Sequence, residues 1–308
     1  MDVLSDAITA MRAGRPESFL NAMSAPWGLR FAASDGAGFH IVLQGSCWLL
    51  PDDGSAPFRL GPGDVVFRTD GRGHGIADDP ATTLTDVVQE PDGSWIIQGE
   101  LPRNTGPTTI VLCGAYRLSR TRAHPLLTAL PGLVHLPARI GAHRELRAAV
   151  DLLGGELERP GPGTDAVVPS LLDTLLLYIL RACLHDQAEG AATGWAAALA
   201  DPAVASALHA IHDQPAHPWT VEELGTRAGL SRAAFARRFS TTVGQPPLTY
   251  LTWWRMTLAG RLLTATEAPL RTIAQQCGYS SEFTFVRAFT REYGTPPGRY
   301  RKVAAPGI

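Results

Sequence analysis

Cysteine is scarce in this sequence of 308 residues, and its spacing excludes two classes of protein. The four cysteines, Cys47, Cys113, Cys183 and Cys277, are scattered without any C-x-x-C pair. A small disulfide-stapled domain and a zinc finger both need cysteines at close, regular spacing. We therefore expect neither, and the pattern is typical of a protein of the reducing cytosol.

Long hydrophobic runs are also lacking. The opening segment, MDVLSDAITAMRAGRPESF, carries acidic residues near its start and no unbroken apolar stretch. It fits neither a signal peptide nor a membrane anchor, and no later stretch reaches about 18 uninterrupted apolar residues. We therefore expect a cytoplasmic protein that does not bind a membrane.

The whole chain has no strong excess of one charge, since its formal net charge is −2, but the charge is unevenly divided. From Asp201 onward 12 Lys and Arg face 7 Asp and Glu, whereas the first 200 residues carry 15 against 22. A basic C-terminal third on an acidic body is typical of a polyanion-binding domain attached to another domain. With 45% hydrophobic residues, both parts can bury a core.

Short apolar runs bounded by turn-forming residues occupy the stretch from about residue 27 to 118. They are FHIVLQGSCWLL, DVVFR, TDVVQ, SWIIQGEL and TTIVLCGAYRL, separated by Gly, Pro, Asp and Asn. This spacing predicts a small β-sandwich or barrel. Before it, apolar residues recur at helical spacing between residues 3 and 11 and predict a short helix laid against that β part.

The pattern becomes helical over residues 143–187. The run ELRAAVDLLGGELE is followed, after a PGPGTD break, by SLLDTLLLYILRACLHD, which is apolar nearly all round. Such a helix must be covered by the β part or by another subunit, and we expect a homodimer interface there. The small residues of QAEGAATG predict a linker. The predicted domains are therefore 1–187 for sensing and dimerisation, 188–200 as the linker, and 201–302.

The last third contains an internal duplication. The first copy is LGTRAGLSRAAFARRFSTTVGQPPLTYL and the second is IAQQCGYSSEFTFVRAFTREYGTPPGRYR, with one extra residue in the second. In each copy a glycine, Gly229 or Gly278, permits a left-handed turn after a first helix. A serine, Ser231 in one copy and Ser280 or Ser281 in the other, is placed to cap the next helix. Each copy therefore predicts a helix-turn-helix unit.

The second helix of each copy is predicted to bury two phenylalanines four residues apart. A single F-x-R-x-F pair is more often plain core packing, but its duplication together with the glycine turns favours DNA reading. The opposite faces offer donors, acceptors, small residues and arginines, as a helix in the major groove needs. The candidate DNA-contacting residues are Arg232, Ala233, Ala236, Arg237, Ser281, Glu282, Thr284, Arg287 and Arg291.

The two copies are joined by a predicted helix, LTYLTWWRMTLAGRLLTA. Sixteen residues, 248–263, span about 24 Å at 1.5 Å per residue. Such a spacer could hold two recognition helices about one DNA turn, or 34 Å, apart. We therefore predict double-stranded promoter or operator DNA as the partner.

At these residues the chain resembles the AraC/XylS family of transcription regulators. The segment AQQCGYSSEFTFVRAFTREYGTPPGRYR is similar to the family signature A-x-x-x-G-[FY]-x-S-x-x-x-F-x-R-x-F-[KR]-x-x-x-G-x-x-P-x-x-Y-R, and the resemblance covers about residues 195–302. Thr290 departs from it, because Lys or Arg is common there. The resemblance implies recognition helices that start near Ser231 and Ser281, and RNA polymerase is a candidate partner.

The first part also resembles the cupin-type sensor domain of one AraC subgroup, through SAPWGLRF, FHIVLQGSCWL and LGPGDVVF. This resemblance implies an α+β protein: a cupin-like β-barrel or sandwich with flanking helices, a helical dimerisation and linker region, and an all-α double helix-turn-helix domain. It also implies a homodimer that senses a small molecule, a metal or an oxidant.

The sensor region has four interpretations, one of which is a structural dimerisation module that senses nothing. His40 and His74 occupy strand-like positions that could converge on a divalent metal, with Cys113 as a third ligand. A metal-free cavity for a small-molecule effector is the second interpretation, and oxidant sensing by Cys47 or Cys113 is the third. The His-x-His plus Glu cluster of enzyme-type cupins is absent.

A transcription regulator without catalytic residues is the favoured function, with the effector signal passing through the helix at 171–184. One alternative is a cupin metalloenzyme with an accessory DNA-binding domain, which the incomplete ligand set argues against. Another is a DNA-architectural protein that has no effector.

Overall fold

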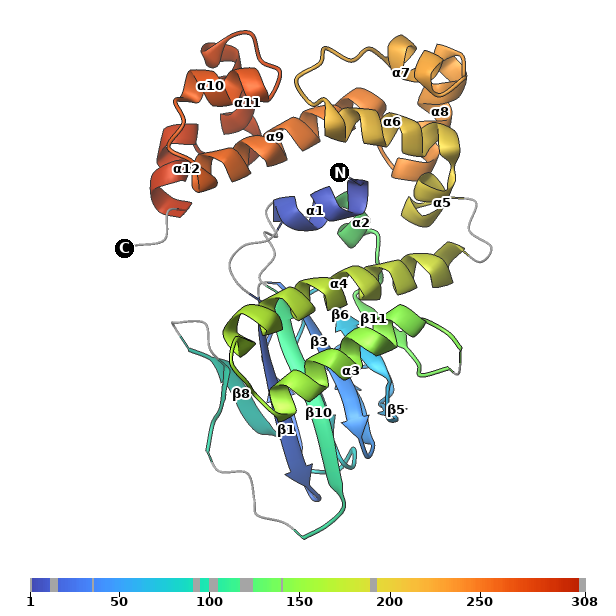
Figure 1. Ribbon diagram of the computed structural model, residues 1–308, viewed down its shortest axis with the longest axis vertical. Helices are drawn as coiled ribbons and strands as arrows, with labels where there is room; N and C mark the ends of the chain where they lie inside the picture. Colours follow the sequence, from blue (N-terminus) through green and yellow to red (C-terminus); the bar gives the residue numbers. More distant parts are fainter. Residues whose placement is uncertain are drawn as a thin grey trace. The chain divides into compact units, whose positions relative to one another are not determined.

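The computed structural model describes residues 2–11, 16–34, 36–90, 95–99, 105–116, 124–139, 141–188 and 193–304. The chain forms two units (Figure 1). The β unit comprises Arg12–Ala123 and Leu130–Asp186. The helical unit comprises Met1–Met11, His124–Ala129 and Gln187–Ile308.

The β unit contains two sheets that enclose a common core. The five-stranded sheet has the order β1 (Glu17–Ser24), β10 (Thr108–Tyr116), β3 (Ala37–Gln44), β6 (Val65–Arg68) and β11 (Leu133–Leu136). The six-stranded sheet has the order β5 (Phe58–Leu60), β4 (Cys47–Pro51), β7 (His74–Ala77), β2 (Gly28–Phe31), β8 (Thr85–Gln89) and β9 (Trp95–Ile97). Among the described strands only β2 and β8 pair in parallel. The predicted cupin-like sandwich is confirmed.

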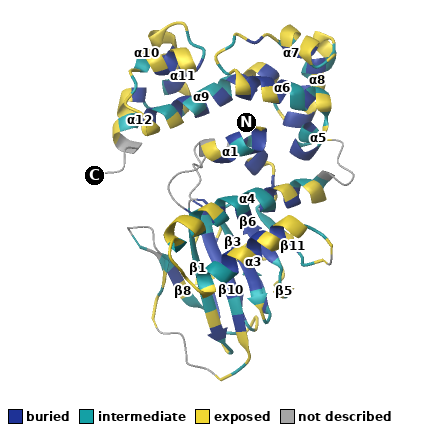
Figure 2. Cartoon of the chain, in the orientation of Figure 1, coloured by how far each residue is buried: buried dark blue, intermediate teal, exposed yellow. Residues whose placement is uncertain are grey.

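Two helices flank the five-stranded sheet, α3 (Arg144–Glu158) and α4 (Thr164–Ala188) (Figure 1). The hydroxyl of Tyr116, at the end of β10, donates a 2.7 Å hydrogen bond to the carbonyl oxygen of Leu172 and ties α4 to the sheet. Figure 2 shows buried residues along the strands that these helices cover. The side chains of α4 that are buried within a single chain include Leu172, Leu175, Leu176, Ile179 and Leu180.

Helix α4 is also, by length and composition alone, apolar enough to cross a membrane over Thr164–Gln187. Core helices of soluble proteins meet the same criterion, so this property is weak evidence of a membrane span. The hydrogen bond that joins α4 to Tyr116 of β10 is typical of a helix packed in a protein core.

The helical unit contains two helix-turn-helix pairs joined by one long helix, as predicted. The first pair is α7 (Val221–Arg227) and α8 (Arg232–Val243), and the second is α10 (Leu270–Gln276) and α11 (Glu282–Tyr293). The joining helix is α9 (Pro247–Ala265). The remaining helices are α1 (Val3–Met11), α2 (Pro125–Thr128), α5 (Trp195–Ala200), α6 (Pro202–Asp213) and α12 (Pro297–Ala304).

Two short segments that precede residue 187 belong to the helical unit. Helix α1 packs against α6 and α9, so the expectation that it lies against the β part is wrong. Its apolar face, with Val3, Leu4 and Ile8 buried, has the periodicity of an amphipathic helix but does not say which surface it covers. Helix α5 lies inside the predicted linker, 188–200.

Candidate DNA-binding surface and sensor cavity

The turn of the first helix-turn-helix depends on two glycines. Gly229 has φ +68°, a left-handed conformation that glycine adopts without a steric penalty. Gly225 is buried in α7, and a Cβ there would lie 3.1 Å from the carbonyl oxygen of Leu230. Ser231 then caps α8 by accepting a hydrogen bond from the backbone N–H of Ala234. The sequence thus fixes the angle at which α8 leaves the turn.

The second turn has the same arrangement, but neighbouring atoms lie closer to its glycine. Gly278 has φ +77°, and a Cβ there would lie 2.9 Å from the carbonyl oxygen of Ala216. Ser281 caps α11 by accepting from the backbone N–H of Thr284. Arg255 of α9 donates to the carbonyl oxygens of Pro215 and His217, 2.7 and 2.8 Å away, and so holds the segment before α7 against the joining helix.

The inner faces of both recognition helices are aromatic. Phe235 and Phe239 of α8 have ring centroids 5.6 Å apart, and Phe285 and Phe289 of α11 have centroids 5.9 Å apart. All four side chains are fully buried. These anchors fix the rotation of each helix, so that its opposite face is turned to solvent.

The predicted DNA-contacting residues lie on those outer faces. Ala236 is half-buried, and the other eight are exposed: Arg232, Ala233, Arg237, Ser281, Glu282, Thr284, Arg287 and Arg291. A neighbouring arginine, Arg238, forms an ion pair with Asp201, whose carboxylate caps α6. Arg238 is therefore held by the protein, whereas Arg237 is exposed on the outer face of α8.

Sequence reasoning missed Phe283 on the first turn of α11. Its side chain is 70% exposed, and the guanidinium of Arg287 lies 5.8 Å from its ring centroid. The periodic pair Phe285 and Phe289 accounts for the core, so a third phenylalanine off that face was the available signal. The N-terminal turn of a recognition helix is where side chains meet base edges.

Helix α9 sets the distance between the two recognition helices. It has 19 residues and is about 28 Å long at 1.5 Å per residue. The hydroxyl of Tyr293 at the end of α11 donates to the carbonyl oxygen of Met256 in the middle of α9, which ties the second pair to the spacer.

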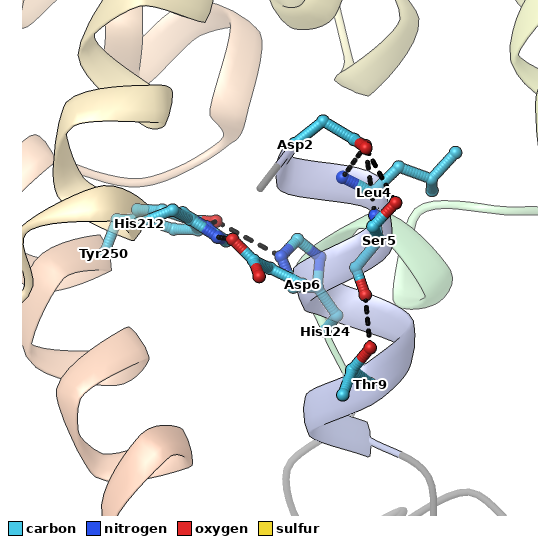
Figure 3. Close-up of polar contacts among 8 residues, drawn as sticks. All are labelled: Asp2, Leu4, Ser5, Asp6, Thr9, His124, His212 and Tyr250. Carbon is cyan, nitrogen blue, oxygen red and sulfur yellow. Dashed lines mark hydrogen bonds and ion pairs between the residues drawn. The ribbon is translucent and has the colours of Figure 1, made fainter.

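A buried polar chain joins α1, α2, α6 and α9 within the helical unit (Figure 3). Asp6 lies 3.2 Å from Nδ1 of His212, whose Nε2 lies 2.7 Å from the hydroxyl of Tyr250. Nε2 of His124 lies 3.2 Å from the same hydroxyl, and its Nδ1 accepts from the backbone N–H of Leu126.

These contacts assign the proton positions along the chain. Because Nδ1 of His124 accepts, its Nε2 carries the proton and donates to Tyr250. The hydroxyl of Tyr250 then donates to Nε2 of His212, and Nδ1–H of His212 donates to Asp6. Burial lowers the pKa of His124 and of His212, although Asp6 partly offsets the shift for His212, and burial raises the pKa of Tyr250. Both histidines are therefore neutral at pH 7.

In the β unit, the three predicted sensor residues come together. Nδ1 of His40 on β3 lies 3.1 Å from Sγ of Cys113 on β10, and its Nε2 lies 2.5 Å from Nε2 of His74 on β7. Burial, with smaller contributions from His74 and Arg68, lowers the pKa of His40 well below its usual value. Burial and Arg68 lower the pKa of His74 to about 4. Both imidazoles are neutral at pH 7.

This arrangement does not form a three-ligand metal centre. His40 stands between its two partners and turns a different nitrogen to each, so one ion cannot reach all three groups. The two Nε2 atoms at 2.5 Å are also closer than two ligands of one zinc ion, which lie about 2 Å from the metal at a tetrahedral angle. In the part of the chain that the structure describes, no group of three His, Cys, Asp or Glu side chains has metal-binding geometry.

The cysteines of the β unit are buried thiols. Cys47 and Cys113 are each 1% exposed, and both side chains belong to the core between the sheets. Burial, assisted by Asp64, raises the pKa of Cys47 to about 12, and burial raises the pKa of Cys113 above its usual value. Oxidants react with thiolates, so neither thiol is activated in this state.

A cavity lies beside His40, His74 and Cys113, between the two sheets. It encloses about 440 Å³ of space free of protein atoms, part of it open to solvent. Its walls include three large aromatic side chains, Phe19, Phe31 and Trp95. Phe31 stacks on His74, with centroids 5.2 Å apart and planes at 13°. Arg68, which sequence reasoning missed, also lines this space.

Comparison with known proteins finds two family models that match different parts of the chain. Residues 2–185 match the family model described as a cupin, and residues 224–303 match a helix-turn-helix domain. A putative AraC-like transcription regulator of Streptomyces lividans is 35% identical over 98% of both chains. The HTH-type transcriptional regulator AlkR of Acinetobacter baylyi is 30% identical over 98% of this chain and 99% of its own.

A solved structure also matches the C-terminal part. The DNA-binding domain of AdpA, in complex with a target DNA, is 32% identical over 33% of this chain and 92% of its own, with a TM-score of 0.32. The full-length relatives and the cupin match together show the family of the chain.

Proposed function

The chain belongs to the AraC-like family of transcription regulators, and we propose that it reads promoter DNA with α8 and α11 under the control of the cavity in its β unit. The observation that carries this proposal is the repeated pair of recognition helices, each anchored by buried phenylalanines with arginines facing outward. Each face combines side chains that bind phosphates with side chains that reach base edges.

We assign the base-reading role to Arg237 on α8 and Arg287 on α11. A guanidinium in the major groove donates two hydrogen bonds to O6 and N7 of guanine. Arg232 and Arg291 are placed to bind phosphates, and Ala233 and Ala236 allow close approach of α8 to the bases. Ser281, Glu282 and Thr284 supply acceptors and donors on the first turn of α11.

Control of DNA binding would pass through the segments that the helical unit takes from the first half of the chain. Helix α1 is followed by β1, and α2 lies between β10 and β11 in the sequence, so both are continuous with strands of the β unit. Both reach Tyr250 of α9 through the buried polar chain of Figure 3. Displacement of either segment would change the packing of the helix that spaces the two DNA-reading units.

The proposal also covers the oligomeric state, the cellular location, the domain bounds and the absence of catalytic activity. We propose a cytoplasmic homodimer, with the sensing part at 1–187, the linker at 188–200 and the DNA-binding part at 201–302, and RNA polymerase as a further partner. We propose that the protein is not an enzyme, because its full-length relatives are named as transcription regulators.

The test uses the full chain and duplexes that it selects from a random pool. Arg237→Ala and Arg287→Ala should each weaken binding to the selected duplex by about 1 to 3 kcal/mol and relax the preference at one position. Arg59→Ala, in the β unit, removes an exposed arginine elsewhere and should leave the affinity unchanged. Equal weakening on every duplex would make Arg237 and Arg287 phosphate contacts, and no weakening would contradict the proposed interface.

A further inference from the structure

Arg68 is a buried cation with unused hydrogen-bonding capacity. It ends β6, is 3% exposed, and donates from Nη2 to Oδ1 of Asp70 at 2.9 Å. Its Nε and Nη1 atoms are also buried and have no hydrogen-bond partner in the structure. Buried donors are normally paired, and a buried charge is normally matched on all sides. The open side of this guanidinium therefore lacks an acceptor among the residues that the structure describes.

The charge around Arg68 is also unbalanced. Asp70 pairs with both Arg68 and Arg72, at 2.9 and 3.6 Å, so one carboxylate serves two guanidinium groups that line the cavity. His40 and His74 add no charge, because both are neutral at pH 7. Asp53 is fully exposed, and water screens its effect on the two arginines. Among the described residues that line the cavity, Arg68 and Arg72 are therefore the charged side chains, and they share the carboxylate of Asp70.

The other wall residues indicate what kind of molecule could carry the acceptor for Arg68. Phe19, Phe31 and Trp95 give it an aromatic lining, which favours a flat, apolar body. The buried Nε1 of Trp95 has no hydrogen-bond partner in the structure either. Among the described residues, Nε and Nη1 of Arg68 and Nε1 of Trp95 are thus buried donors at this cavity without an acceptor.

We infer that this cavity binds a small organic anion, an aromatic or short-chain monocarboxylate, with its acidic group on Arg68 and its apolar body between Phe31 and Trp95. The inference rests on the proposed function, since it names the chemical class of the effector. A divalent cation is the opposite choice, because Arg68 and Arg72 would repel it.

Calorimetric titration of the full chain tests this. The probes are benzoate, indole-3-acetate and hexanoate, with their neutral amides as controls and inorganic phosphate as an anion that has no apolar body. At least one acid should bind about tenfold more tightly than its amide and than phosphate, since a charged acceptor bonds more strongly to a guanidinium. Equal binding of acid and amide, tighter binding of phosphate, or no binding of any acid below about 10 mM would overturn the inference.

The matched variants are Arg68→Met, which keeps the length of the side chain, and Arg59→Met, which removes an exposed arginine on β5. Arg68→Met should erase the difference between acid and amide, whereas Arg59→Met should retain it. Circular dichroism checks that Arg68→Met folds, and Arg68→Gln repeats the test if it does not. An unchanged preference for the acid in either Arg68 variant would overturn the assignment.

Affinity for the selected duplex, measured with and without each probe, separates this inference from the proposed function. An acid that binds at Arg68 without changing DNA affinity would support the inference and contradict control by the cavity. DNA affinity that responds only to the neutral amides would contradict the inference and leave the proposed control intact.

Discussion

Nε2 of His212 lies 2.7 Å from the hydroxyl of Tyr250, and both side chains are buried at the junction of α1, α6 and α9. Tyr250 is the tyrosine of the repeated P-P-x-x-Y sequence, so a residue that marks the helix-turn-helix repeat also holds the N-terminal helix. This contact connects the spacer between the two reading helices to the start of the chain through His212 and Asp6.

Removal of the Tyr250 hydroxyl should destabilise the helical unit. Tyr250→Phe removes the hydrogen-bond partner of the buried Nε2 of His212, and an unpaired buried polar atom costs about 1 to 3 kcal/mol. Urea unfolding of the full chain, followed by circular dichroism, measures the change. Tyr178→Phe on α4 is the control and should stay within about 0.5 kcal/mol of the parent. Equal stability of Tyr250→Phe and the control would show that the chain of Figure 3 adds nothing.

Acidification should destabilise the fold between pH 6.5 and pH 4. Burial lowers the pKa values of His40, His74, His124 and His212 in the folded chain, so the unfolded chain binds more protons below pH 6.5. Stability is therefore complete above the unfolded pKa and is lost as the pH falls, by about 1.4 kcal/mol per pH unit for each histidine. Unfolding free energies at several pH values measure the slope. His74→Gln should reduce it, and a flat profile would contradict the burial of neutral histidines.

Phe283 should read thymine. Its exposed ring on the first turn of α11 is suited to contact the C5 methyl group in the major groove. Phe283→Ala should weaken binding to a duplex with thymine at that position by about tenfold, or 1.4 kcal/mol. Replacement of that thymine by uracil, which lacks the methyl group, should weaken the parent but not the variant.

The control for Phe283 is Leu248→Ala, which shortens an exposed apolar side chain on α9. Fluorescence anisotropy on both duplexes completes the comparison. If uracil weakens parent and Phe283→Ala equally, Phe283 does not contact the methyl group.

The two turn glycines should differ in their sensitivity to alanine. Both have positive φ, and a left-handed non-glycine residue costs about 1 to 2 kcal/mol. A Cβ at Gly229 meets open space, whereas one at Gly278 would press on the carbonyl oxygen of Ala216 and the guanidinium of Arg255. Gly278→Ala should therefore lower the melting temperature more than Gly229→Ala. The reverse order would contradict the packing of the second turn.

Local features of the fold could be predicted from the sequence. The glycine turns, the serine caps and the paired phenylalanines act within one helix-turn-helix, so Gly229, Ser231 and Phe235 suffice to indicate the first unit. The β-sandwich followed from short apolar runs, its cupin-like character followed from the family resemblance, and the structure brings His40, His74 and Cys113 together.

The features that could not be predicted depend on tertiary contacts. Apolar periodicity shows that α1 has a buried face, but nothing in residues 3–11 names α6 and α9 as its partners. Arg68 closes a strand in the sequence and resembles an ordinary exposed strand end, so its burial in the cavity is visible only in the structure. Phe283 was hidden by the periodic pair beside it.

Methylation protection of guanine N7 on the selected duplex, which reports major-groove contacts, is the most direct measurement of the central claim. With the full chain we predict, for each bound subunit, two clusters of protected guanines about 10 base pairs apart on one face of the DNA. Arg237→Ala should lose protection in one cluster and Arg287→Ala in the other. A single cluster, or the loss of the same cluster in both variants, would contradict the reading of DNA by α8 and α11.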